Sequence, residues 1–173
     1  MQLTNPTNTE DYEFAFCFDV KGQNIFGNAD PDTWYTNVQY GFRGANGEPP
    51  APVLYAYYDA LPQANANPDY LRLAVLYVAP LTWTVIDPDD IGTLPGSVED
   101  YSFGMMFDAV DNTVDPPFFL EGYAMVGDGA YGAQYSQFLP IYEAMAAEPD
   151  AHVLNPRFVY TPKITWSTWD FEA

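Results

Sequence analysis

Hydrophobic and polar residues alternate with a period of two along much of the chain. In YEFAFCFDV, residues 12–20, the aromatic side chains fall on one face, and the other face carries Glu13, Ala15, Cys17 and Asp19. Successive side chains of a β-strand point to opposite faces, so this alternation predicts a strand that buries one face. Similar patterns or short apolar runs occur at 33–42, 53–59, 70–78, 82–87, 101–110, 118–126, 152–160 and 163–171.

Segments rich in Gly, Pro, Asn and Asp separate these expected strands. Gly and Asn accept positive φ, Pro fixes φ, and Asp bonds its own backbone, so such segments predict turns. Eight or nine strands joined in this way indicate an all-β antiparallel sandwich or barrel. With 173 residues, 48% of them hydrophobic, the chain has the size of one domain. We expect a polar N-terminal arm over 1–10 and a single domain over 11–173.

One segment has helical spacing instead. Phe138, Ile141, Tyr142 and Met145 recur at intervals of three and four, and Pro149 follows them. This spacing predicts a short helix near residues 137–147, which we expect to cover one end of the β-structure.

The charge of the chain is strongly negative, and this excludes some partners. There are 24 acidic residues against 5 basic ones, which gives a net charge of −19. Binding to nucleic acid or to anionic lipid requires clustered Lys and Arg, so direct nucleic-acid binding is not expected. The most apolar run, residues 73–83, is too short to span a bilayer, so no transmembrane segment is expected.

Acidic residues concentrate in DPDDIGTLPGSVED, residues 87–100, which raises the question of calcium. An EF-hand loop that began at the first of these residues would need an oxygen ligand at position 5 and Glu at position 12, where Ile91 and Val98 stand. The EF-hand motif therefore fails. Two interpretations remain, a plain acidic turn or a looser calcium site with the candidate ligands Asp87, Asp89 and Asp90; no other cofactor is expected. The segment 108–115, with Asp108, Asp111 and Asp115, allows the same two interpretations.

Residues for catalysis are sparse, so we do not expect an enzyme. The chain has one cysteine, Cys17, and one histidine, His152, and neither belongs to a recognisable nucleophile motif. Glu121 shares a strand face with Phe119, Tyr123 and Met125. A solvated or subunit-interface position explains that carboxylate better than catalysis does.

Large aromatic residues occupy both faces of some expected strands. Alternation places Trp166 and Trp169 on opposite faces, and likewise Tyr57 and Tyr58. Such residues can fill cores or subunit interfaces, and they can also stack on sugar rings. Two apolar faces in one small domain favour extensive contact with other subunits.

From end to end, the chain resembles the small major capsid protein of tailless icosahedral viruses with an internal membrane, particularly bacteriophages of Thermus and their haloarchaeal relatives. The resemblance lies in length, acidity, the opening strand DYEFAFCFDV after a polar arm, and the closing RFVYTPKITWSTWDF. It implies a single jelly roll of about eight strands in two four-stranded sheets. It also implies a homodimer that joins a larger major capsid protein and neighbouring capsomers in the virion, after synthesis in the host cytoplasm. The resemblance brings no active site.

Two functions from different classes follow. The first is a structural virion protein that self-associates and co-assembles with a larger capsid protein into an icosahedral shell around an internal membrane. The alternative is a carbohydrate-binding β-sandwich module, in a virion spike or a lectin-like protein, that stacks sugars on Tyr and Trp and is calcium-dependent through its acidic loop.

Overall fold

The structure is a computed structural model. It describes residues 11–21, 32, 34–43, 70–111, 115, 118–126, 139, 142–143, 146–147 and 153–169. Everything that follows about the fold refers to these residues. The expected arm over 1–10 and the expected strand at 53–59 lie outside them.

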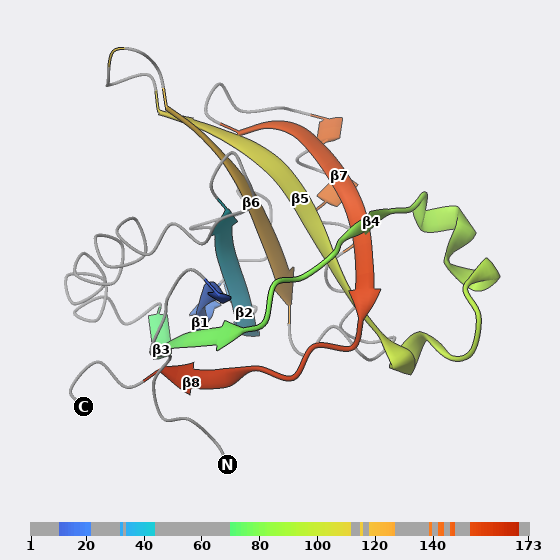
Figure 1. The fold of residues 1–173 in the computed structure, drawn as a ribbon, viewed down its shortest axis with the longest axis horizontal. Coiled ribbons are helices and arrows are strands. Elements are labelled where there is room, and N and C mark those ends of the chain that lie inside the picture. The colour runs from blue at the N-terminus through green and yellow to red at the C-terminus, as the bar shows by residue number, and fades with distance from the viewer. Residues whose placement is uncertain are drawn as a thin grey trace.

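Eight antiparallel strands form one sheet, in the order β4-β7-β5-β6-β2-β1-β3-β8 (Figure 1). Their bounds are β1 Glu13–Lys21, β2 Trp34–Arg43, β3 Tyr70–Val78, β4 Thr84–Val85, β5 Tyr101–Asp111, β6 Phe118–Val126, β7 Val153–Pro162 and β8 Ser167–Trp169. The all-β antiparallel architecture predicted from the alternation is confirmed, and it fits a sandwich. The strands are hydrogen-bonded in one series rather than in two separate sheets, so the jelly-roll topology stays a prediction.

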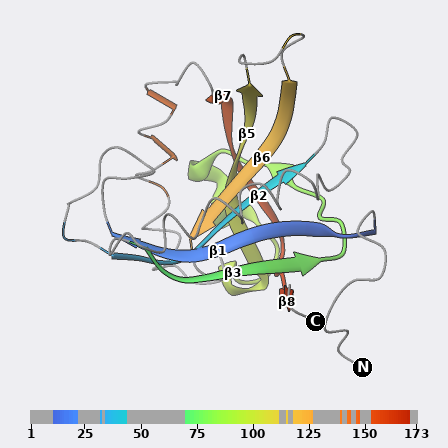
Figure 2. The ribbon, with the colours of Figure 1, turned by 90° about the vertical axis from the view of Figure 1, so that its left-hand side faces the viewer.

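The sheet is strongly twisted. In Figures 1 and 2, β3 runs at a steep angle to β5, β6 and β7, and in Figure 2 β1 runs alongside β3. The register of β1 shifts between Phe18 and Val20 against β2, and between Cys17 and Asp19 against β3. An extra residue in one strand bends it and increases its twist, so these irregularities help the sheet to curve.

The main core lies on one face of this sheet, here called the first face. It is defined by buried residues from six strands and from η2: Phe14, Phe16, Phe18, Val38, Val75, Tyr77, Ile91, Phe103, Met105, Phe107, Ala124 and Phe158. Contacts cross between strands, as in the rings of Tyr40 and Phe107, whose centroids are 5.4 Å apart. The aromatic positions of 12–20 were predicted to lie in the core, and those of Phe14, Phe16 and Phe18 do.

The opposite face, here called the second face, is also buried. It is defined by Ala15, Met106, Tyr123 and Val159, which Leu81, Trp83 and Trp166 cover. These three covering residues lie in the connections 79–83 and 163–166. The prediction that β1 is only half-buried is therefore wrong, since Glu13 and Ala15 are fully buried. The alternation could not reveal this, because the covering residues come from distant parts of the chain.

Hydrogen bonds hold the two covering connections in place. The Leu81 backbone N–H donates to Oε1 of the buried Glu13 at 2.8 Å, and Thr161 Oγ1 donates to the Thr82 carbonyl at 3.0 Å. The second connection is fixed by the Ile164 N–H, which donates to Oγ of the buried Ser102 at 3.0 Å. Glu13, which the alternation placed on the exposed face of its strand, thus anchors the layer that covers it, together with Ser102 and Thr161.

Little of the described chain is helical. Within the helix expected near 137–147, the described residues Leu139, Tyr142, Glu143, Ala146 and Ala147 are helical. Tyr142 packs edge-on against Phe158 of the first face, with ring centroids 5.4 Å apart. Two short 3-10 helices, η2 Pro88–Thr93 and η3 Val98–Asp100, precede β5. No helix in the described residues is both long and apolar enough to cross a membrane.

Candidate functional site

The acidic loop before β5 uses two of its carboxylates as helix caps. Asp87 precedes η2, and its Oδ1 accepts from the Asp89 N–H at 3.0 Å. At η3, Ser97 and Asp100 form a capping box, in which Asp100 Oδ2 accepts from the Ser97 N–H at 2.9 Å. Caps of this kind satisfy backbone N–H groups that have no partner within the helix. The loop geometry therefore has a local cause that involves no ion.

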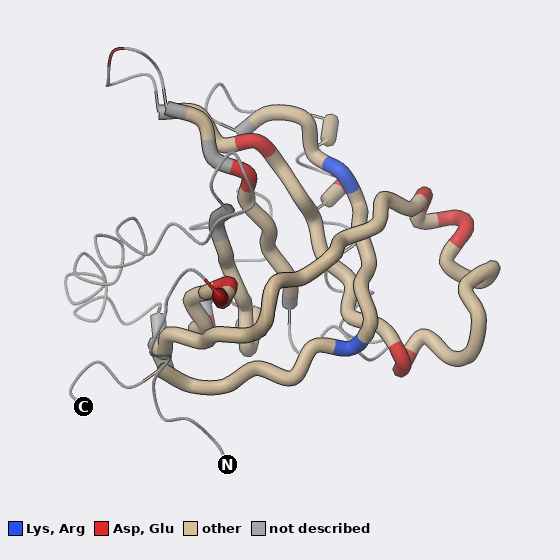
Figure 3. The backbone as a smooth tube through the Cα atoms, viewed as in Figure 1, with Lys and Arg blue, Asp and Glu red and all other residues tan. Residues whose placement is uncertain are grey.

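The calcium candidates Asp87, Asp89 and Asp90 all lie on the exposed side of this loop. Figure 3 shows the acidic positions spread along the loop at the right of the view. Among the described residues, no group of three or more His, Cys, Asp and Glu side chains is arranged to hold a metal ion. The structure thus accounts for the acidic turn, and calcium binding at these residues stays a prediction.

A second acidic cluster lies on the second face, where β5, β6 and β7 meet. Asp108 is paired with Glu121 of β6 and with Leu154 of β7. One step along the strands, Met106 is paired with Tyr123 and Arg157. Paired residues of neighbouring antiparallel strands project to the same face, so the sheet register gathers these side chains into two adjacent rows.

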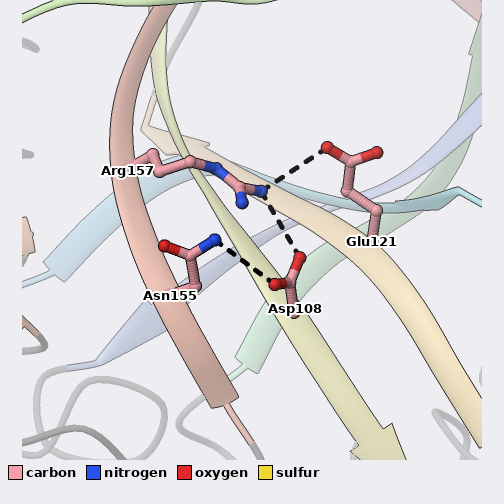
Figure 4. A network of polar contacts seen from close by, with 4 residues as sticks. All are labelled: Asp108, Glu121, Asn155 and Arg157. Atoms are coloured by element: carbon pink, nitrogen blue, oxygen red, sulfur yellow. Dashed lines mark hydrogen bonds and ion pairs between the residues drawn. The ribbon is translucent and has the colours of Figure 1, made fainter.

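Arg157 joins the two carboxylates of this cluster. Its Nη2 lies 3.5 Å from Asp108 Oδ1 and 3.5 Å from Glu121 Oε1. Asn155 Nδ2 donates to Asp108 Oδ2 at 3.4 Å (Figure 4). The three charged side chains are between 23% and 42% exposed, so solvent weakens these ion pairs. The cluster joins three strands and carries one net negative charge.

Two large apolar side chains flank this cluster. Phe119 is 57% exposed and Leu154 is 41% exposed. Phe119, Glu121 and Tyr123 alternate along β6 and share one face. Phe119 is exposed at one end of this series, and Tyr123 is fully buried at the other. We call Asp108, Phe119, Glu121, Leu154 and Arg157 the outer patch. The face shared by Phe119, Glu121 and Tyr123 was predicted from the sequence, but the arginine partner of the carboxylate was not.

A cavity of about 370 Å³ lies on the second face, beside strands β1, β2 and β3. Its lining consists of Cys17, Asn37, Gln39, Leu76, Lys163, Ile164, Thr165 and Trp166. The connection 163–166 forms one wall, and its place is fixed by the Lys163 N–H, which donates to the Asp100 carbonyl at 3.0 Å, together with the Ile164 bond to Ser102. The volume falls at the lower end of the range of small-molecule sites in proteins.

Hydrogen bonds orient the amide side chains in this cavity. Trp166 Nε1 donates to Gln39 Oε1 at 3.1 Å, and the Cys17 thiol donates to Asn37 Oδ1 at 2.6 Å. Asn37 has a positive φ of 54°, and its backbone N–H donates to Asp19 Oδ1 at 2.9 Å. A positive φ is uncommon outside glycine, although Asn tolerates it better than most residues. No sequence pattern singled out Asn37 or Gln39, because the alternation over 33–42 predicts a strand and not what packs against it.

The remaining candidate residues are dispersed. Cys17 lies in the cavity, while His152 lies outside the described residues. Trp166 and Trp169 lie on opposite faces as predicted. Trp166 covers the second face, and Trp169 packs against Phe14 on the first face, with ring centroids 4.7 Å apart. Asp115 is exposed and lies after the end of β5. Tyr57 and Tyr58 lie outside the described residues.

Comparisons with protein families, with curated proteins and with solved structures find no match for this chain.

Proposed function

We propose that the chain is a structural virion protein, a major capsid protein that self-associates and co-assembles with a larger capsid protein into an icosahedral shell around an internal membrane. The observation that carries the proposal is the outer patch, where Phe119 and Leu154 remain exposed at the edge of an otherwise buried sheet face. Exposed apolar side chains beside a charged cluster are typical of contact surfaces between proteins.

The chemistry of the outer patch suits a subunit contact. Arg and aromatic residues are enriched in the energetically important centres of interfaces. Here Arg157 stands between two carboxylates and next to Leu154, so an approaching subunit would exclude water from ion pairs that are now partly exposed. Water exclusion strengthens such pairs, provided that each charge keeps a partner.

The net charge sets a condition on assembly. Subunits that each carry −19 repel one another, and salt shortens the range of that repulsion to about 8 Å at physiological ionic strength. Association through the outer patch should therefore increase with salt, until screening is complete.

Light scattering on size-separated protein tests both self-association through the outer patch and its dependence on salt. We expect dimers or larger assemblies that grow as salt is raised, and we expect the double variant Phe119→Ser/Leu154→Ser to lose them. The matched control is Val85→Ser/Val98→Ser, which removes two other exposed side chains, 63% and 39% exposed, outside the patch. A strict monomer at every salt concentration would contradict the proposal, and equal loss in both double variants would contradict the role of the patch.

Co-assembly is tested separately, by mixing the chain with the candidate larger capsid protein and following turbidity against ionic strength. The resemblance supports this part of the proposal, together with the confirmed all-β fold. Assembly of the pair that does not respond to salt would contradict the charge argument.

The alternative function, a carbohydrate-binding module, has one observation in its favour. Trp166, an aromatic residue predicted to stack on sugars, lines a cavity together with Asn37, Gln39 and Thr165. Amide and hydroxyl groups beside an aromatic ring are a common means of orienting polar ligands. A glycan array with and without EDTA distinguishes calcium-dependent from calcium-independent sugar binding. Loss of binding with EDTA would point to calcium at the acidic loop.

A further inference from the structure

We propose that the cavity between β1, β2, β3 and the connection 163–166 binds a small hydroxylated carboxylic acid of the sugar-acid class. This proposal does not depend on the proposed capsid function, because a capsid subunit and a carbohydrate-binding module could both contain such a cavity. Three features of its lining lead to this ligand class: the direction of its hydrogen-bonding groups, its charge and its apolar wall.

The hydrogen-bonding groups of the lining favour a ligand rich in acceptors. Oε1 of Gln39 already accepts from the Trp166 indole N–H, and Oδ1 of Asn37 already accepts from the Cys17 thiol. Gln39 is 1% exposed. Within the described part of the chain, its side chain makes a single hydrogen bond, which its amide oxygen accepts. Its NH₂ group therefore remains a donor in the lining, and Thr165 adds a hydroxyl. Ligand oxygens are the natural partners of these donors.

The charge of the lining favours a negative group on the ligand. None of the eight lining residues is acidic, although the chain has 24 Asp and Glu against 5 Lys and Arg. Lys163 is one of the lining residues, and it is exposed at the rim. Asp19 lies nearby, but its Oδ1 accepts from the Asn37 backbone N–H and the residue is outside the lining. A carboxylate at the rim gains a charge-assisted contact with the lysine.

The apolar part of the lining suits the carbon skeleton of a ring. Leu76 and Ile164 are buried and line the cavity, and Trp166 is half-buried beside them. An indole offers a flat apolar surface on which the C–H face of a pyranose can pack. The volume of about 370 Å³ accommodates one monosaccharide and leaves little room for a chain of sugars.

Cys17 provides a direct readout of occupancy, because it is the only cysteine and it lines the cavity. The experiment measures alkylation of the folded protein by iodoacetamide, a neutral reagent, using intact mass. The probes are D-glucuronate, D-glucose and acetate, at equal ionic strength. Saturation-transfer NMR with the same three probes checks binding without the reagent.

We expect D-glucuronate to slow alkylation and to bind at least about threefold more tightly than D-glucose or acetate, since neither of these combines the carboxylate with the ring. Lys163→Met should weaken the binding of D-glucuronate by about threefold to tenfold. Lys21→Met, which removes the same charge at a lysine paired with Asp32 3.3 Å away, should leave the affinity unchanged.

Three outcomes would overturn the proposal. The first is that D-glucuronate neither binds nor protects Cys17. The second is that D-glucose binds as well as D-glucuronate and is insensitive to Lys163→Met, which would make the cavity a neutral-sugar site. The third is that the two lysine variants weaken binding equally, which would show a general effect of net charge. None of these outcomes bears on self-association through the outer patch.

Discussion

The two faces of the sheet are built from the same strands but differ in chemistry. The first face is packed with aromatic and aliphatic residues such as Phe14, Phe107 and Phe158, all at most 1% exposed. The second face places Glu13 and Gln39, equally buried, among its apolar residues. The first face packs largely against apolar side chains and needs mainly volume, whereas a face covered by irregular connections needs polar side chains to hold their backbone.

The second face also carries both candidate sites. The outer patch lies on β5, β6 and β7, and the cavity lies between β1, β2, β3 and the connection 163–166. Polar side chains that hold a covering segment can also present hydrogen-bonding groups to a ligand, as Gln39 does. Among the buried residues of the first-face cluster, only Tyr77 carries a side-chain oxygen or nitrogen atom.

Loss of packing on the first face should lower stability more than any other change considered below. Phe107→Ala removes a fully buried ring and should lower the free energy of unfolding by about 3–5 kcal/mol, because the transfer energy is lost and a cavity remains. Urea denaturation followed by tryptophan fluorescence measures this change. The exposed Phe119→Ala is the control, with an expected change within about 0.5 kcal/mol. Equal costs at the two positions would contradict the assignment of the core.

Two glycines allow the same test on each face. A Cβ added at Gly122 would collide with the Phe107 ring on the first face, and one added at Gly41 would collide with the Tyr123 ring on the second. Each Gly→Ala change should cost about 1–3 kcal/mol through overpacking. Gly122→Ala should cost more, because the Phe107 ring lies within the main core, whereas the Tyr123 ring packs against Trp83 of a connection that two hydrogen bonds hold. A larger cost for Gly41→Ala, measured by urea denaturation, would show the second face to be the more rigid.

Glu13 tests whether polar residues hold the covering connection. Glu13→Leu deprives the Leu81 N–H of its acceptor and should cost about 1–3 kcal/mol, whereas Glu13→Gln keeps an acceptor oxygen and should cost less. Hydrogen exchange at the Leu81 amide should accelerate in the leucine variant and stay slower in the glutamine variant. Unchanged exchange in both variants would mean that other contacts hold the connection.

The smallest effect is expected at Arg157. Its ion pairs with Asp108 and Glu121 are partly exposed, so Arg157→Met should change the free energy of unfolding of the monomer by at most about 1 kcal/mol. Analytical ultracentrifugation of the same variant should show weaker self-association, because the outer patch loses its cation. A large loss of stability without an effect on association would assign the cluster to the fold alone.

The sequence predicted the residues of the first face in more detail than those of the second face. The period of two located the strands and the core aromatic residues of β1, and it placed Trp166 and Trp169 on opposite faces. It placed Glu13 on the exposed face of its strand, because alternation describes one strand at a time. The acidic loop was recognised as a turn with two open interpretations, and the capping roles of Asp87 and Asp100 appeared only with the backbone geometry.

The all-β class, the short helical segment and the strong negative charge could be predicted from the sequence, because they follow from local periodicity and composition. Which side chains meet became clear from the folded chain alone. Arg157 reaches Asp108 and Glu121 through the pairing of three strands, and Trp166 reaches Gln39 across 127 positions of the chain. Contacts of that separation depend on strand register and on the path of the connections, which no local pattern encodes.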